Sequence, residues 1–70
     1  MDIKYISYQI LAHGLKNVNP LNLPKFLQPE FINGMISYYE SQKETKLNHL
    51  DLPEIRKEIK SAIINILCKS

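Results

Sequence analysis

Apolar residues recur at helical spacing along the last third of the chain. Within residues 51–69 they recur every three or four positions, at Leu52, Ile55, Ile59, Ala62, Ile63 and Ile66. A stripe of this kind is typical of an amphipathic helix that packs on a core. A pattern typical of helix starts precedes this stripe: Asp51 is followed three residues later by Glu54, with Pro53 between them. The sequence therefore predicts a capped helix from Asp51 to Lys69.

A second apolar arc covers residues 29–42. Pro29 suits the first turn of a helix. The residues that share one side of the wheel are Phe31, Ile32, Met35, Ile36, Tyr38 and Tyr39. Gly34 lies in mid-helix, where glycine costs about 1 kcal/mol relative to alanine. We therefore expect another backbone to approach closely at Gly34, and we expect residues 43–50 to form a polar connection.

The first segment has two interpretations. Ile3, Ile6, Ile10 and Leu11 recur at helical spacing after Asp2, a possible cap, and Gly14 is a natural left-handed helix end. The alternation of Ile6, Tyr8 and Ile10 also fits a strand. A single strand would need a partner that the rest of the chain does not offer, so we favour the helix. The strand remains the alternative, in a dimer that pairs two N-terminal strands.

Residues 16–23 are rich in asparagine and proline, which predicts a loop. Val18, Leu21 and Leu23 are expected to fold inwards from it and fill the core. A short helix should follow at residues 24–27, cut off by Pro29. The predicted fold is a single all-α domain over residues 1–70, with three main helices, one short helix and a loop-plugged core.

Length and composition point towards association with another chain. A chain of 70 residues with 44% hydrophobic content folds, but its core is thin. Cys68 is the only cysteine, so no internal disulfide can form, and His13, His49 and Cys68 have no zinc-finger spacing. A homodimer is the expected supplement. The lone cysteine, the missing secretory signal and the missing apolar run of about 20 residues predict a cytoplasmic protein without a membrane span.

The reverse side of the last helix indicates where a partner would bind. Ile64 projects about 180° from Ile55, Cys68 lies one turn further on, and Leu67 widens the apolar arc. A single exposed isoleucine is also common on monomers. Tyr5 and Tyr8 are the next candidates, because tyrosine is enriched at interfaces, although tyrosines also rim small cores. The predicted partner-binding residues are Ile64, Leu67, Cys68, Tyr5 and Tyr8.

The sequence shows no catalytic, cofactor-binding, metal-binding or small-molecule motif, which predicts a protein that is not an enzyme. The expected function is a non-enzymatic protein–protein interaction module or a small regulatory subunit. The alternative is a small dimeric DNA-binding transcriptional regulator with phosphate contacts on Arg56, Lys57 and Lys60. Glu54 and Glu58 interleave with these residues and the net charge is only +2, so nucleic acid is the less favoured partner.

Overall fold

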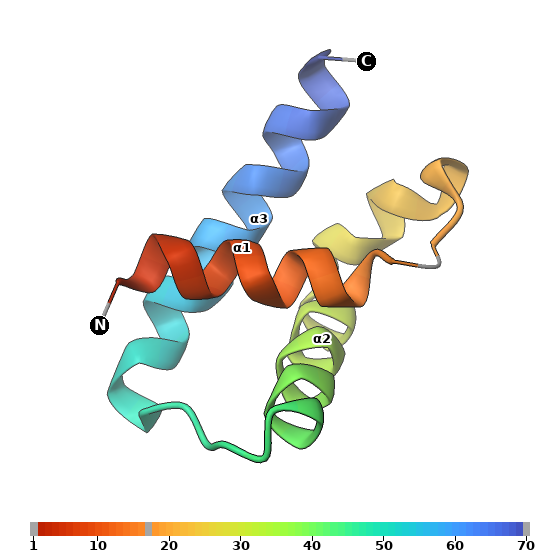
Figure 1. Ribbon diagram of the computed structural model, residues 1–70. Coiled ribbons are helices and arrows are strands. Elements are labelled where there is room, and N and C mark those ends of the chain that lie inside the picture. Colours follow the sequence, from red (N-terminus) through yellow and green to blue (C-terminus); the bar gives the residue numbers. More distant parts are fainter. Residues whose placement is uncertain (1, 17, 70) are drawn as a thin grey trace.

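Helices form most of the chain in the computed structural model, which describes residues 2–16 and 18–69. The elements follow in the order α1 (Ile3–Gly14), η1 (Pro20–Leu27), α2 (Pro29–Gln42), η2 (His49–Asp51) and α3 (Leu52–Lys69), where η denotes a 3-10 helix. In Figure 1, α1 crosses in front of α3. The C-terminal end of α3 lies above α1, and α2 lies below α1. The predicted all-α class is confirmed.

The strand alternative for residues 4–10 is wrong, because this segment is helical and the described ranges contain no strand. The side chain of Asp2 caps α1 by accepting a hydrogen bond from the backbone N–H of Tyr5 at 3.3 Å. The buried hydroxyl of Ser7 donates to the carbonyl oxygen of Ile3 at 2.7 Å. Because this bond satisfies the hydroxyl within α1, Ser7 can face the core at no polar cost.

The core lies where the helices meet. Its buried hydrophobic residues are Ile10, Leu11, Leu23, Ile32, Met35, Ile36, Ile55, Ile59, Ala62 and Ile63. The four largest fully buried side chains are all isoleucines. One belongs to α1 and three belong to α3: Ile10, Ile55, Ile59 and Ile63. Burying one such side chain contributes about 1.5–3 kcal/mol, so the crossing of α1 and α3 is the main source of stability.

The glycines have roles other than those predicted. Gly14 lies inside α1 without a positive φ, and Leu15 ends the helix by donating its N–H to the carbonyl oxygen of Leu11 at 2.9 Å. A Cβ at Gly14 would lie 2.6 Å from Cγ and from Sδ of Met35, so Gly14 lets α2 approach α1. At Gly34, apart from its two chain neighbours and the adjacent backbone of α2 itself, no atom of the described residues comes within 4 Å of a Cβ position. The expected close backbone approach at Gly34 is therefore wrong within this chain.

The segment predicted as a loop and a short helix is one 3-10 helix from residue 20 to Leu27, with residue 17 outside the described ranges. The side chain of Asn19 accepts from the N–H of Leu21 at 3.0 Å and starts this helix. Leu23 is buried as expected, but Leu21 is 86% exposed. A 3-10 helix turns about 120° per residue, so residues two apart cannot face the same side.

The entry into α3 also differs from the prediction. Asp51 is the last residue of η2 and not the cap. The side chain of Asn48 caps the turn by accepting from the N–H of Leu50 at 2.9 Å. Just before it, the N–H of Leu47 donates to Oε2 of Glu40 at 2.9 Å, which ties the connection back to α2. The helical path into α3 therefore starts one turn earlier than the sequence indicates.

Candidate interaction surfaces

The end of α3 extends beyond the helix crossing (Figure 1). We call residues 63–68 the α3 tip. Ile63 is buried and Leu67 is half-buried, whereas Ile64 and Ile66 are each 43% exposed and Cys68 is exposed. Asn65 is the one polar side chain in the α3 tip apart from the thiol. A helix that is apolar around its whole circumference is normally covered on all sides. The α3 tip is covered on only part of its circumference.

Ile66 was predicted to belong to the core stripe, but its side chain is exposed. It lies on the same side of α3 as Ile59, which is fully buried. The stripe emerges into solvent because α3 continues past the elements that keep it buried as far as Ile63. Ile66 lines an apolar hollow of about 190 Å³ together with Leu15, Val18 and Leu23. The periodicity of the sequence predicts the apolar stripe of α3. It does not predict the residue after which the other elements no longer pack against this stripe.

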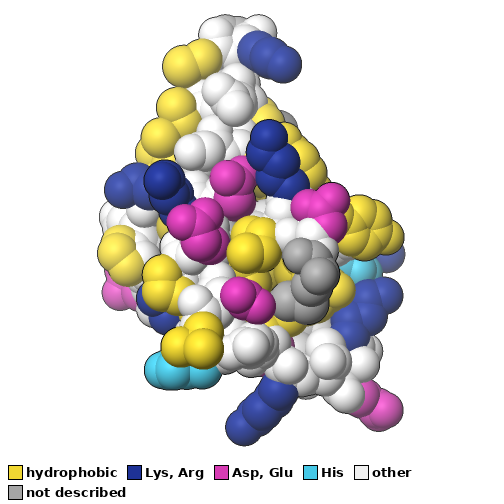
Figure 2. All heavy atoms as spheres, turned by 90° about the vertical axis from the view of Figure 1, so that its left-hand side faces the viewer, with side chains coloured by type: hydrophobic (Ala, Val, Ile, Leu, Met, Phe, Trp, Pro, Cys, Tyr) yellow, Lys and Arg dark blue, Asp and Glu magenta, His cyan; other side chains and the backbone are white. Residues whose placement is uncertain are grey.

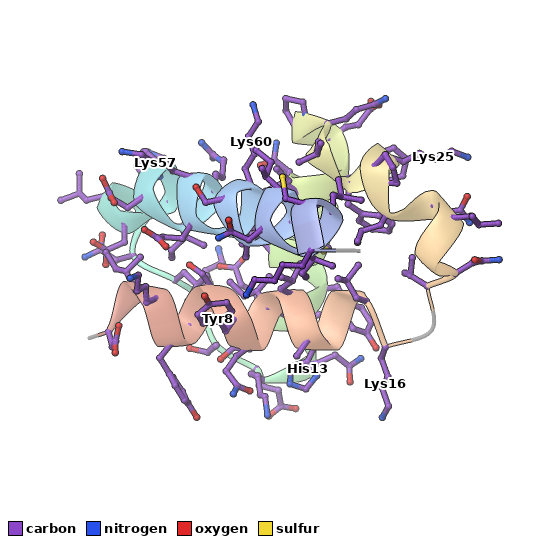
Figure 3. The ribbon with its side chains drawn as sticks, turned by 90° about the horizontal axis from the view of Figure 1, so that it is seen from above. Tyr8, His13, Lys16, Lys25, Lys57 and Lys60 are labelled. Carbon is purple, nitrogen blue, oxygen red and sulfur yellow. The ribbon has the colours of Figure 1, made fainter. Side chains whose placement is uncertain are left out.

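The predicted partner-binding residues lie on different sides of α3. Tyr8 of α1 shares a second hollow with Ile66 and Asn65, and Figure 3 shows Tyr8 on the face of α1 seen from above. Ile64 precedes Ile66 by two residues and so projects about 200° away from it. Tyr5 is exposed on α1. Tyr8 and Ile66 thus flank one side of the α3 tip, and Ile64 with Cys68 forms the other.

Three basic residues in the first half of α3, Arg56, Lys57 and Lys60, are exposed. Nε of Arg56 donates to Oδ1 of Asn33 at 3.0 Å, a bond that joins the exposed surfaces of α3 and α2. Lys57 and Lys60 are exposed, and Figure 3 places both on the same side of the molecule as Lys25 of η1. On the face seen in Figure 2, acidic and basic side chains alternate and no patch of one sign forms.

A groove runs along α2 on a different part of the surface. We call it the α2 groove, and its volume is about 320 Å³. Three aromatic side chains, two smaller apolar positions and a carboxylate form most of its lining: Phe26, Phe31, Tyr38, Gly34, Met35 and Glu30. His13 and Gly14 close it on the α1 side. The rings of Phe26 and Phe31 are 5.4 Å apart at 54° and form one aromatic wall.

The sequence alone does not predict this groove. Its residues come from α1, η1 and α2, and their proximity depends on how these elements pack. The one signal for it in the sequence is Gly34, a glycine inside an apolar helical arc. Among the lining residues in the described ranges, Glu30 alone carries an acidic charge, and none is a lysine or an arginine.

No group of three or more histidine, cysteine, aspartate or glutamate residues is close enough to hold a metal ion within residues 2–16 and 18–69. His13 instead packs its ring against Tyr39, with centroids 5.8 Å apart.

In the same described ranges, no helix combines the length and apolar character needed to cross a membrane. Comparisons of the chain with protein-family models, curated proteins and solved structures found no match.

Proposed function

We propose that this protein is a protein–protein interaction module that self-associates through the α3 tip. The observation that carries the proposal is the exposed side of the α3 tip that Ile64 and Cys68 form. A second chain that packed along this side would remove its apolar surface from water. Because the part of the chain that the structure describes contains ten buried hydrophobic residues, such burial adds substantially to a small total.

A second copy of the chain is the partner that fits best. Twofold symmetry places the same surface on both chains, and two antiparallel α3 helices centred near Ile64 would put each tip on the other.

Self-association is tested by sedimentation or light scattering over a range of micromolar concentrations. We expect the wild-type chain to have a dimer mass, and we expect Ile64→Glu to have a monomer mass with an unchanged helical circular-dichroism signal. A buried charge without a partner is costly, so this glutamate should prevent the contact. The matched control is Leu50→Glu, because Leu50 is 82% exposed in η2, away from the tip.

Two results would contradict the proposal. A wild-type chain that stays monomeric over the whole range would exclude a homodimer. If Ile64→Glu loses its helical signal, Ile64 belongs to the folding core and does not form an interface.

A second candidate function is DNA binding by a small regulator. It is favoured by the position of Lys25 on the same side as Lys57 and Lys60, which extends the predicted basic site from α3 to η1 (Figure 3). Phosphate contacts release counterions, so the affinity for duplex DNA should fall steeply with salt. Binding at two salt concentrations tests this, with Lys57→Ala and Lys60→Ala weakening it and Lys46→Ala as control. Salt-independent binding, or none, would exclude it.

A further inference from the structure

The α2 groove exists because residue 34 is a glycine. Phe31 and Tyr38 lie three residues before and four residues after Gly34, so the three positions share one face of α2. With no side chain at Gly34, the two aromatic side chains flank bare backbone, and the space above it is open to at least 4 Å. Gly34 is not needed for φ, since no glycine has a positive φ. The fold itself therefore gives no reason for a glycine at this position.

The lining of the groove determines which charge it accepts. Phe26, Phe31 and Tyr38 are its aromatic members, and the faces of aromatic rings attract cations. Glu30 lies one helical turn before Gly34 and supplies a carboxylate. Since no lysine or arginine of the described residues lines the groove, an anion would find no fixed positive charge there. Aromatic rings and a carboxylate together favour a cation with an apolar body.

The size of the groove favours a small ligand. Its volume of about 320 Å³ lies at the lower end of ligand pockets, which range from roughly 300 to 1,000 Å³. The buried side chain of Met35 forms the floor, so an apolar ligand body would displace water from apolar surface.

We propose that the α2 groove binds a small organic cation of the arylalkylammonium class. The apolar body lies between Phe31 and Tyr38 over Gly34, and the ammonium group lies at Glu30. The site is independent of self-association, because it shares no residue with the α3 tip.

The charge preference is tested with three probes of nearly equal size and different charge. Isotope-labelled protein is titrated at neutral pH with phenethylammonium, phenethyl alcohol and phenylacetate, and backbone amide shifts are followed by NMR. We expect saturable shifts around Gly34, with phenethylammonium binding about fivefold to tenfold more tightly than the alcohol, as expected for one exposed ion pair plus a cation–π contact. Phenylacetate should bind most weakly.

Glu30→Gln tests the role of the carboxylate. It should bring the affinities for phenethylammonium and phenethyl alcohol to within about twofold of each other, because the ion pair is lost. The matched control is Glu54→Gln, which removes an acidic residue from the first turn of α3, as Glu30→Gln does from the first turn of α2. The control variant should keep the full preference for the cation.

Gly34→Leu tests the open space. The added side chain should abolish the shifts caused by all three probes, while the thermal midpoint stays equal or rises because leucine favours helix over glycine. Ser41→Leu, at an exposed position of α2 outside the groove, should leave binding unchanged. The proposal is overturned if none of the probes binds saturably, if phenylacetate binds as tightly as the cation, or if Gly34→Leu still binds the cation.

Discussion

Gly14 and Gly34 are both helical, but the space around them is opposite in character. A side chain at Gly14 would meet Met35, whereas one at Gly34 would project into an open groove. The two positions therefore separate two reasons for a glycine, namely close packing between helices and an opening at the surface. Alanine substitutions distinguish these reasons directly.

We expect Gly34→Ala to raise the free energy of unfolding by about 1 kcal/mol, because alanine loses less backbone entropy in a helix and the new methyl group has room. Urea denaturation followed by circular dichroism measures the change. A loss of stability would mean that an unobserved neighbour occupies the space at Gly34.

Gly14→Ala should lower the free energy of unfolding by about 1–3 kcal/mol, the range typical of overpacked cores. The reason is that Met35 is buried and would have to move away from the new Cβ. The same denaturation experiment measures it. An increase equal to that of Gly34→Ala would show that Met35 moves away freely.

The sequence predicted the cost of a mid-helix glycine at residue 34 but not its surroundings. The pattern of one helix shows which of its residues share a face. It does not show which residue of another helix lies opposite, and for this reason the contact between Gly14 and Met35 was not foreseen. The α2 groove was missed for the same physical reason.

At the scale of elements, the entry into α3 gives the clearest prediction. Asn48→Ala should lower the free energy of unfolding by about 1 kcal/mol through loss of a helix cap, because Oδ1 of Asn48 accepts from the N–H of Leu50. Asp51→Ala should have less than half this effect. Urea denaturation of both variants measures the difference. A larger loss for Asp51→Ala would restore Asp51 as the cap.

Element boundaries were predictable where a chemical signal coincided with periodicity. The bounds of α2 were predicted from Pro29 and the apolar arc, and α2 has these bounds. The 3-10 helices were missed or only partly predicted, because a 3-10 helix is short and has no apolar repeat of period 3.6. Leu21 is an example: it was expected in the core, but its side chain is exposed on the 3-10 helix η1.

At the scale of the whole molecule, the stability depends on a small core. A chain of 70 residues has a total stability of about 4–10 kcal/mol. Ile59→Ala should cost about 2–5 kcal/mol and remove much of it, because Ile59 is fully buried. Ile66→Ala, on the same side of α3 but exposed, should cost less than half as much in the monomer. Urea denaturation of both variants in an Ile64→Glu background, which keeps the chains monomeric under the proposed function, measures the two costs.

The all-α class was predictable because periodicity and caps act locally. The arrangement of the surface was not predictable, because it depends on where α1 crosses α3. The crossing leaves part of the α3 tip uncovered and places Tyr8 and Ile64 on different sides of α3. The predicted partner-binding residues therefore come from the pattern of each helix taken alone. That pattern does not contain the relative orientation of α1 and α3.

The single cysteine of the chain lies at the α3 tip and is exposed. A thiol-reactive spin label would therefore attach at one known position without any substitution. If two chains pair through their tips, the two labels come close together, and the dipolar coupling between their unpaired electrons reports the spacing. An antiparallel pair centred near Ile64 places the labels about one turn to either side of the centre, whereas a parallel pair places them side by side. The distance between labels at Cys68 of the two chains would thus distinguish an antiparallel dimer from a parallel one.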